Sequence, residues 1–441
     1  MNLPAYPKYK PSGVEWLGDV PESWDVLSVK RLTPVQRGAS PRPIEDPKYF
    51  DEEGEYSWVR IADVTRNHHY LVKTTQRLSE LGKKLSVPLE PGVLFLSIAG
   101  SVGKPMITKI KACIHDGFVY FPQLEIDPEL LYYIFESGQP YLGLGKLGTQ
   151  LNLNTDTVGN IKVCVPSPSE QQKIADFLDW KTGQIDALIA KKKLLIEKLK
   201  EKRIALITHA VTKGLNPNAK MKDSGISWLS EVPEHWEIKP VKFLTRILRG
   251  QFSHRPRNDP AYYDGKYPFV QTGDIARANK YVSNYSQTLN NLGLSVSKQF
   301  PAGTLVMTIA ANIGDMAIIN FKACFPDSIV GFVPESNIDL QFLYYMFVAM
   351  KQRLLMTAVL NTQLNLNIDR IGSIPTIEPP LGVQKQIVDF LDQNTKKIDT
   401  LIAKKQQLIE KLTEYRTALI TAATTGKIDV RGIEIPQGRS Q

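Results

Sequence analysis

The sequence predicts an α+β protein in which two mixed α/β domains are joined by two long antiparallel helices, as an internal repeat with pseudo-twofold symmetry. Long segments of the first half of the 441-residue chain recur in the second half. The best-matching segment has helical periodicity, and short β-type runs fill the stretches between. The expected parts are a first domain, a central helix, a second domain, a C-terminal helix and a tail, over residues 1–165, 166–213, 214–378, 379–425 and 426–441.

The duplication is the strongest signal in the chain. The motif S-G-x-x-W-L-x-x-V-P-E-x-W begins at Ser12 and again at Ser224. Residues 171–208 align without gaps with residues 384–421, and 25 of the 38 positions are identical. Chance does not produce such a match, so each half holds one variable stretch followed by one nearly repeated stretch.

The repeated stretch has the pattern of a long amphipathic helix, about 38 residues and roughly 57 Å in length. Its apolar residues fall on positions a and d of a heptad, with Ile189 and Ile196 beside that seam. The seam residues that we expect in the spacer or against a partner are Leu178, Ile185, Leu188, Leu195 and Leu199, and in the second copy Leu391, Ile398, Leu401, Leu408 and Leu412.

Neither helix can bury a one-sided apolar stripe alone. The plain solution is that the two helices pack on each other, antiparallel, as a spacer. The alternative is that each helix pairs with another protein. Both arrangements can hold at once, because Ile189, Ile196 and their copies lie off the central seam.

The variable stretches, roughly residues 25–165 and 237–378, have the pattern of mixed α/β domains. Runs such as YSWVRIADV and GVLFLSIAG, or YPFVQTGDI and GTLVMTIAA, alternate with turn residues. Each stretch is expected to end with an apolar helix, PELLYYIFES or LQFLYYMFVAMKQRLL. Each domain thus has about 140 residues, a usual domain size. We expect a shared architecture with different surface residues.

Composition excludes some classes of protein. No run of eighteen apolar residues and no apolar signal core occur, so we expect no membrane span and a cytoplasmic location. The three cysteines lie far apart, without a CxxC pair or zinc spacing. The 54 basic residues exceed the 45 acidic ones by 9, which permits a polyanionic partner such as nucleic acid but does not require one.

No catalytic signature is convincing. Gly100–Lys104 resembles a phosphate loop, but a proline stands where a serine or threonine should bind magnesium. The Asn/Asp-Pro-Pro-aromatic loop of an amino-methyltransferase does not occur. The neighbours His68-His69 and His115-Asp116 suggest a dyad or a metal site, yet such pairs are usually structural. We therefore expect no catalytic residue, no metal ligand and no cofactor in this chain.

Binding chemistry remains. Arginine reads guanine, and asparagine or glutamine reads adenine, through paired donors and acceptors in the major groove. The candidate DNA-binding residues in predicted loops are Arg37, Ser40, Arg42, Arg60, Lys104, Thr149, Gln150 and Asn152 in the first domain, and Arg249, Gln251, His254, Arg255, Arg257, Gln271, Asn312, Thr362, Gln363 and Asn365 in the second. Surface loops are polar in any protein, so no single candidate is decisive. The TQLNLN segment, shared by both halves, is expected to hold the DNA backbone or shape a loop.

Taken together, these segments resemble the specificity subunits of Type I restriction-modification systems. The resemblance covers nearly the whole chain. It rests on VPESW and VPEHW, WVRIADV and FVQTGDI, IAGSVG and IAANIG, GTQLNLN and NTQLNLN, and the paired helices beginning EQQKIADFLD and VQKQIVDFLD.

The resemblance implies that each variable domain is a target recognition domain that reads one half of a split site in double-stranded DNA. It also implies that the helices set the number of unread bases between the halves. Two modification subunits would dock on the helices, carrying S-adenosylmethionine and methylating adenine N6. Restriction subunits would add translocation and cleavage, with ATP and Mg on those partners.

Two other functions remain open from the sequence. A self-sufficient DNA methyltransferase or nuclease is disfavoured by the missing loops, and a methyl-transfer assay on the chain alone separates it from a binding subunit. A coiled-coil scaffold without a nucleic-acid role predicts no salt-dependent affinity for DNA. It also leaves unexplained why the helices match while the domains diverge.

Overall fold

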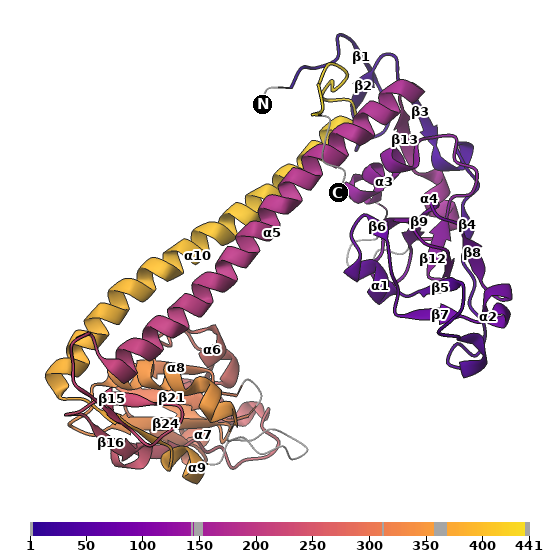
Figure 1. The fold of residues 1–441 in the computed structure, drawn as a ribbon. Helices are drawn as coiled ribbons and strands as arrows, with labels where there is room; N and C mark the ends of the chain where they lie inside the picture. Colours follow the sequence, from indigo (N-terminus) through magenta and orange to yellow (C-terminus); the bar gives the residue numbers. More distant parts are fainter. Residues whose placement is uncertain (1–2, 143, 145–152, 311–312, 357–367, 437–441) are drawn as a thin grey trace. The chain divides into compact units, whose positions relative to one another are not determined.

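Two compact units make up the chain in the computed structural model, which describes residues 3–142, 144, 153–310, 313–356 and 368–436. Unit 1 comprises residues 1–193 together with 407–441, and unit 2 comprises residues 194–406. Each unit combines one α/β domain with parts of both long helices, α5 (Pro168–Lys213) and α10 (Leu381–Thr424), labelled in Figure 1.

Unit 1 contains two main sheets, in the orders β4-β12-β9-β10-β6 and β7-β5-β11-β8, and the two-stranded pairs β1-β2 and β13-β3. Its strands are β1 (Tyr9–Pro11), β2 (Asp19–Pro21), β3 (Asp25–Ser28), β4 (Gln36–Arg37), β5 (Tyr56–Val59), β6 (Tyr70–Leu71), β7 (Gln76–Leu78), β8 (Val87–Leu89), β9 (Leu94–Ser97), β10 (Pro105–Thr108), β11 (Ala112–Ile114), β12 (Phe118–Tyr120) and β13 (Lys162–Val165). The helices before α5 are α1 (Ile61–Arg66), α2 (Glu80–Lys84), α3 (Pro128–Glu136) and α4 (Thr155–Asn160).

Unit 2 repeats this order without a counterpart of β6, with main sheets β17-β24-β21-β22 and β19-β18-β23-β20 and pairs β14-β15 and β16-β25. Its strands are β14 (Met221–Asp223), β15 (Glu231–Pro233), β16 (Glu237–Pro240), β17 (Thr245–Arg249), β18 (Tyr263–Phe269), β19 (Gln287–Leu289), β20 (Lys298–Phe300), β21 (Thr304–Thr308), β22 (Met316–Ile319), β23 (Ala323–Phe325), β24 (Ile329–Pro334) and β25 (Pro375–Glu378). Its helices are α6 (Thr272–Arg277), α7 (Asn291–Ser295), α8 (Leu340–Met356) and α9 (Ile368–Gly372). The predicted α+β fold and internal repeat are confirmed.

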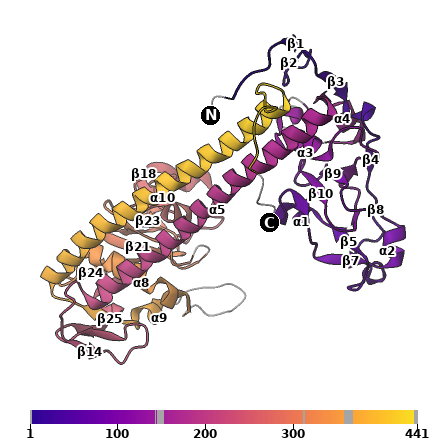
Figure 2. The same cartoon turned by 45° about the horizontal axis from the view of Figure 1, so that its top comes forward.

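In each unit, one domain helix packs against both long helices, which run side by side and antiparallel (Figures 1 and 2). The core of unit 1 joins residues 130–135 of α3 to Ile174 and Leu178 of α5 and to Leu419 and Ile420 of α10. In unit 2, residues 342–347 of α8 meet Ile207 and Val211 of α5 and Ile387 and Leu391 of α10. The domains are therefore fixed to the helices by shared cores.

The repeated tryptophan motif closes the ends of the long helices. Gly214 and Gly426 follow α5 and α10 with φ values of +77° and +70°, the left-handed conformation that glycine allows at a helix end. Gly426 lies against the buried Trp24, and Gly214 lies against Trp236, so a Cβ at either position would press on the motif. This packing explains why the motif occurs twice.

The seam between the helices differs from the prediction in one respect. Leu178, Ile185, Leu391 and Ile398 are buried as expected, but the predicted seam residues Leu188, Leu195, Leu401 and Leu408 are 45, 40, 44 and 38% exposed. Ile196 and Ile409, which we expected beside the seam, are only 6 and 7% exposed.

The physical reason is a choice between adjacent apolar residues. Both possible stripes share Leu178, Ile185 and the half-buried Leu199, spaced by whole heptads. In each heptad, a second residue also faces the partner helix. It lies four residues after the shared position rather than three, so that Ile196 is buried and Leu195 is exposed. The first residue of that series, Thr182, is buried with its hydroxyl 3.1 Å from the hydroxyl of Tyr133 on α3.

Two equivalent ion pairs hold the antiparallel helices in register. In unit 2, Nε of Arg203 on α5 lies 2.9 Å from Oδ1 of Asp399 on α10. In unit 1, Nε of Arg416 on α10 lies 3.0 Å from Oδ1 of Asp186 on α5. The repeat makes Arg416 the counterpart of Arg203, and Asp399 that of Asp186. The same contact is therefore made twice, which is the pseudo-twofold relation in its simplest form.

In the part of the chain that the structure describes, no helix is long and apolar enough to cross a membrane.

Replacing Asp399 by alanine should lower the free energy of unfolding by about 1–3 kcal/mol, because the guanidinium of Arg203 would lose its carboxylate acceptor at a partly buried seam. Asp186→Ala should cost less, since Arg416 keeps Glu136 at 3.3 Å. Urea unfolding of the full chain measures both. Glu197→Ala, which removes an exposed pair with Lys200, is the control and should change nothing measurable. Equal losses in all three variants would contradict the role given to the seam.

Candidate nucleic-acid interface

An aspartate organises the arginine-rich loop of unit 1. Oδ1 of Asp116 accepts a hydrogen bond of 2.8 Å from the Ser40 hydroxyl, and Oδ2 pairs with the Arg42 guanidinium at 2.9 Å. The Asp116 carbonyl oxygen accepts a hydrogen bond of 2.6 Å from Nε of Arg37. The hydrogen bond from Ser40 and the nearby Arg42 hold the pKa of Asp116 below its ordinary value. Three predicted DNA-binding residues are thus brought together around one anion.

In unit 2 an aspartate again gathers arginines of the preceding loop, but the individual contacts differ. Asp327 is the repeat counterpart of Asp116, and its two oxygens accept hydrogen bonds of 2.6 and 2.9 Å from the Arg257 guanidinium. Arg255 lies 3.6 Å from the same carboxylate. A guanidinium has five N–H donors, so an arginine held by a single carboxylate keeps donors for phosphates or base edges.

Glycines bring each loop onto its aspartate. The sequence Arg-Gly occurs at Arg37-Gly38 and again at Arg249-Gly250. A Cβ at Gly38 would collide with the carbonyl oxygen of His115, and one at Gly250 would collide with that of Pro326. Only glycine allows this close approach of two backbone segments. The glycines therefore serve the position of the loop, while the exposed arginines before them are available for contacts.

Arg60 and Gln271 occupy equivalent places, directly before α1 and α6. The backbone N–H of Arg60 donates to Oδ2 of the buried Asp63 at 3.0 Å, and that of Gln271 donates to Asp274 at 2.9 Å. These aspartates start the helices, which explains the repeated ADV and GDI motifs. The capped helix starts fix the backbone from which two different side chains project.

Both side chains line a pocket in their own unit. Arg60 shares a pocket of about 850 Å³ with Gln76 and other residues, and Gln271 shares one of about 340 Å³ with Gln287. In unit 2, Nε2 of Gln271 donates a hydrogen bond to Oε1 of Gln287. Gln76 in unit 1 and Gln287 in unit 2 are repeat counterparts. The pockets therefore differ at the other position, which is Arg60 in unit 1 and Gln271 in unit 2.

The remaining candidates are less close to these clusters or lie outside the described residues. Lys104 is half-buried, its Nζ lies 3.4 Å from the carbonyl oxygen of Asn67, and burial lowers the pKa of its ammonium group. Gln251 is exposed, and its backbone bonds to Phe325. The candidates outside the described residues are Thr149, Gln150, Asn152, Asn312, Thr362, Gln363 and Asn365.

Within the residues that the structure describes, His115 and Asp116 lie side by side without a hydrogen bond between the imidazole and the carboxylate. Nδ1 of His115 accepts a hydrogen bond of 2.9 Å from the backbone N–H of Gly117 and lies 3.8 Å from Asp116. Burial lowers the pKa of His115. An imidazole that accepts a hydrogen bond from a backbone N–H two residues later stabilises the local backbone turn. Sequence reasoning found this pair but missed that Asp116 gathers the arginines, because Ser40 and Arg42 are remote from it in sequence.

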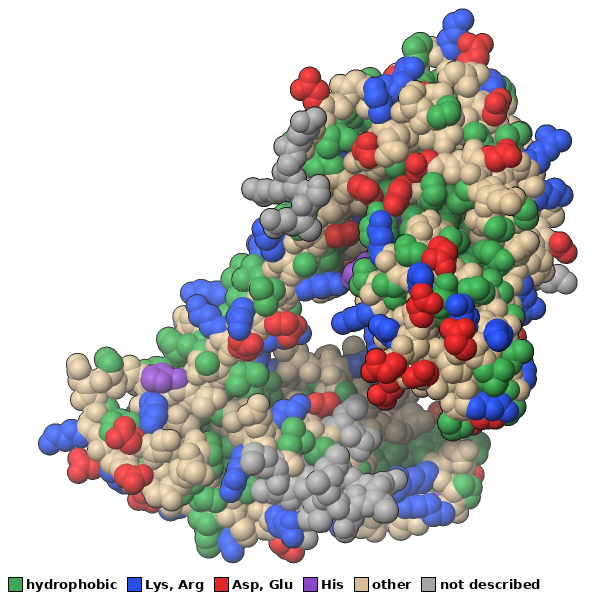
Figure 3. Space-filling model, turned by 45° about the vertical axis from the view of Figure 1, so that its right-hand side comes forward, with side chains coloured by type: hydrophobic (Ala, Val, Ile, Leu, Met, Phe, Trp, Pro, Cys, Tyr) green, Lys and Arg blue, Asp and Glu red, His purple; other side chains and the backbone are tan. Residues whose placement is uncertain are grey.

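Charge alone does not mark the site. On the face shown in Figure 3, the basic and acidic side chains of each unit are interspersed. The excess of 9 basic residues is therefore not visible there as one patch, and the candidate interface rests on the loops and pockets described above.

The chain is similar to known proteins in sequence and in fold. The family model described as "Type I restriction modification DNA specificity domain" matches residues 21–198 and again residues 233–411. The MjaVIII specificity subunit of a Type I restriction enzyme, from Methanocaldococcus jannaschii, is 23% identical over 431 residues, which cover 94% of this chain and 95% of that protein. The MjaIX specificity subunit of the same organism is 25% identical over 269 residues, which cover 59% of this chain and 60% of that protein.

The fold is also similar to that of a chain in a solved structure concerned with complex assembly and conformational transition of the type I R-M system. The TM-score is 0.72 with 14% identity, over 93% of this chain and 99% of that one. The family model matches both copies of the repeat and most of the chain. The chain therefore belongs to the family of Type I restriction-modification DNA specificity subunits, non-catalytic proteins of DNA recognition.

Proposed function

We propose that this specificity subunit reads a bipartite target in double-stranded DNA, with one half of the target contacted by each α/β domain. One observation carries the proposal. Both units place an aspartate-anchored arginine loop and a polar pocket on the same framework of strands, yet the side chains that project from it differ. A scaffold without a recognition role would have no reason to keep the framework and vary these side chains.

The differences are of the kind that distinguishes bases. Arg60 presents donors that suit O6 and N7 of guanine, whereas Gln271 in the equivalent place suits N6 and N7 of adenine. The anchored arginines, Arg42 in unit 1 and Arg257 in unit 2, suit phosphates, which position a protein on the duplex. We assign base reading to the pocket residues and backbone contact to the loops.

We further infer that two modification subunits dock on the long helices. Leu188 and Leu401, equivalent residues on α5 and α10, are exposed although they belong to the nearly identical repeat. Pairs of exposed leucines one heptad apart, Leu188 with Leu195 on α5 and Leu401 with Leu408 on α10, support two equivalent partner contacts. S-adenosylmethionine, ATP and Mg are then expected on modification and restriction subunits of a cytoplasmic complex, with no cofactor in this chain.

Mapping of methylated adenines in a host that carries this chain and its modification partner tests the proposal. A target in two halves separated by unread bases is expected, and a single contiguous target would refute bipartite reading. The purified chain alone should transfer no methyl group, since no base-holding loop occurs in its sequence. Methyl transfer by the isolated chain would instead make it an enzyme.

Substitution of Arg60 should affect one half of the target only. Arg60→Lys keeps the charge but loses the paired donors, and should weaken binding of the cognate half by about 1–3 kcal/mol. Gln271→Ala should do the same for the other half. Competition binding with duplexes altered in one half or the other measures both. If either variant weakened both halves equally, the pockets would not be independent readers.

Introducing a charge at an exposed leucine should change the stoichiometry of the complex. Leu188→Glu should reduce the complex from two modification subunits per chain to one, and the double variant Leu188→Glu/Leu401→Glu should abolish binding, because a carboxylate in an apolar interface is desolvated without a partner. Mass measurement by light scattering checks this. The control is Ala190→Glu, an exposed position on the other side of the seam, which should still bind two subunits.

A further inference from the structure

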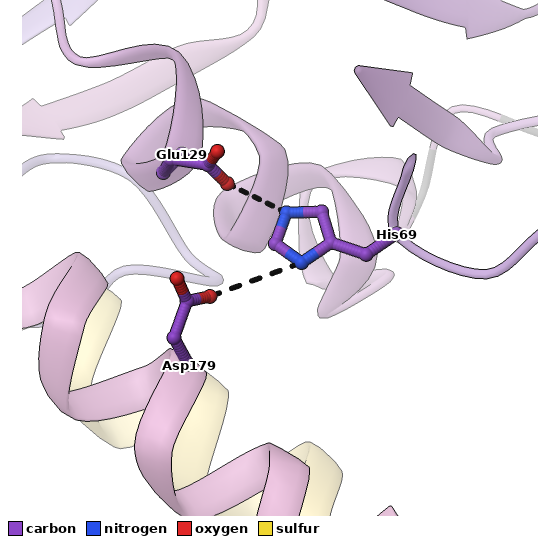
Figure 4. A group of neighbouring side chains, drawn as sticks. All are labelled: His69, Glu129 and Asp179. Atoms are coloured by element: carbon purple, nitrogen blue, oxygen red, sulfur yellow. Dashed lines mark ion pairs between the residues drawn. The ribbon is translucent and has the colours of Figure 1, made fainter. Parts of the chain in front are cut away.

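His69 in unit 1 connects three elements through one side chain. It follows α1, and its ring is stacked between the rings of Tyr70 and Tyr132, with centroid distances of 4.1 and 3.7 Å. Its Nε2 lies 2.6 Å from Oε2 of Glu129 on α3, and its Nδ1 lies 3.8 Å from Oδ1 of Asp179 on α5 (Figure 4). The loop after α1, the domain helix and the long helix therefore meet at His69.

A histidine with two carboxylates also has the composition of a metal site. A metal ion bonds to one ring nitrogen, and its other ligands surround that same ion. Figure 4 shows the two carboxylates at opposite nitrogens of the ring. This geometry suits a protonated imidazolium, which has one N–H donor on each side. The cluster is therefore better described as a cation held between two anions.

The equivalent position in unit 2 is a lysine. Lys280 follows α6 as His69 follows α1, and a tyrosine comes next in both copies. Nζ of Lys280 lies 2.7 Å from Oε1 of Gln341 on α8 and forms an ion pair with Asp392 on α10. It also lies 4.7 Å from the ring centre of Tyr345.

The surroundings match residue by residue as well. Gln341 and Asp392 are the repeat counterparts of Glu129 and Asp179, and each lies on the corresponding helix. A tyrosine pair on the domain helix lines the cation in both units. Both copies of the repeat therefore place a basic side chain at this position, which is a histidine in unit 1 and a lysine in unit 2.

The environment of His69 is mainly acidic. The titratable groups that face it are Tyr70, Glu129, Tyr132, Tyr133 and Asp179, and Lys109 lies over the Tyr70 ring. Burial alone would raise the pKa of Glu129, but the hydrogen bond and charge of His69 bring that pKa below its ordinary value. Burial raises the pKa of Asp179. Without a positive charge at His69, the half-buried Glu129 and the exposed Asp179 would keep only the hydrogen bonds from the hydroxyls of Tyr70, at 2.8 Å, and Tyr133, at 2.6 Å.

The loop that carries His69 is fastened to α1. Nδ2 of the buried Asn67 donates to the carbonyl oxygens of Asp63 at 2.8 Å and Lys73 at 3.1 Å, and its Oδ1 accepts from the backbone N–H of Val72 at 3.2 Å. Asp63 also caps the start of α1 at Arg60. The position of His69 is therefore linked to the position of Arg60 through one short helix.

We propose that His69 and Lys280 are positioning residues whose positive charge ties α1 and α6, the helices that follow Arg60 and Gln271, to the long helices. In unit 1 this tie depends on the protonation of His69. The proposal rests on the DNA-reading function proposed above. Recognition of the half-site read by unit 1 then depends on pH, whereas recognition by unit 2 does not, because a lysine keeps its charge throughout the neutral range.

The sign follows from the charges. A protonated His69 places its positive charge between Glu129 and Asp179, so the tie is stronger when the imidazole carries its proton. Binding to the first half-site should therefore weaken by about five-fold as pH rises through the range in which imidazole side chains in general lose their proton, a coupling typical of linked sites. Binding to the second half-site, measured on the same molecules, should change much less.

The experiment measures binding of the full chain with its modification partner to duplexes in which either half of the mapped target is scrambled, across that pH range. His69→Lys should give unit 1 the same permanent positive charge that Lys280 supplies in unit 2, and should remove the pH dependence. His69→Gln should bind the first half-site weakly at every pH. Lys280→His, the matched exchange, should make the second half-site pH-dependent. EDTA should have no effect.

Each alternative outcome has a distinct meaning. Equal pH profiles for both half-sites, or a pH dependence that persists in His69→Lys, would refute the proposed role of His69. Loss of binding in EDTA that zinc restores would show a metal site instead. Hydrogen exchange of residues 61–73 without DNA, compared with His69→Lys at each pH, separates the two proposals. A pH-dependent loss of protection there without sequence-specific binding would reject the DNA-reading function but keep the tie.

Discussion

Burial of one helix stripe against its own copy is the constraint on which the rest of this structure depends. Neither α5 nor α10 could leave such a stripe in water, since each exposed leucine or isoleucine side chain forgoes about 1.5–3 kcal/mol of burial. In each unit the partner helix and the domain helix, α3 or α8, cover it together. The domains are consequently part of the same cores as the helices, and the Arg203–Asp399 and Arg416–Asp186 pairs fix the register of both.

The repeat made most of the fold predictable, because a segment duplicated at this level must fold in the same way twice. The helices, their antiparallel pairing and the α+β domains followed from periodicity and turn residues. The choice between Leu195 and Ile196 did not, since both stripes are apolar and only the three-dimensional contact at Thr182 and its neighbours decides between them. The residue types at the candidate interface were found, but the organising role of Asp116 and Asp327 was not, because their partners lie about 70 residues away or more.

An internal repeat also separates positions that the fold requires from positions that are free to differ, because the two copies can be compared with each other. Gly38 and Gly250, or Asp63 and Asp274, are kept because each serves a backbone approach or a helix start that both copies need. Arg60 and Gln271 project from the same backbone position and differ. His69 and Lys280 are an intermediate case, in which the charge is kept and the group that bears it is exchanged.

The division of the chain has a consequence for its synthesis. Unit 2 is one continuous stretch, residues 194–406, whereas unit 1 needs the last part of α10, which supplies Leu419, Ile420 and Ala423 to its core. Domains usually fold in the order in which the ribosome releases them. Here the first domain keeps one flank of its core uncovered until residues 407–424 of α10 have been synthesised. A chain that stopped before residue 419 would lack Leu419, Ile420 and Ala423, and the apolar side chains of α3 and α5 that pack with them would be left uncovered.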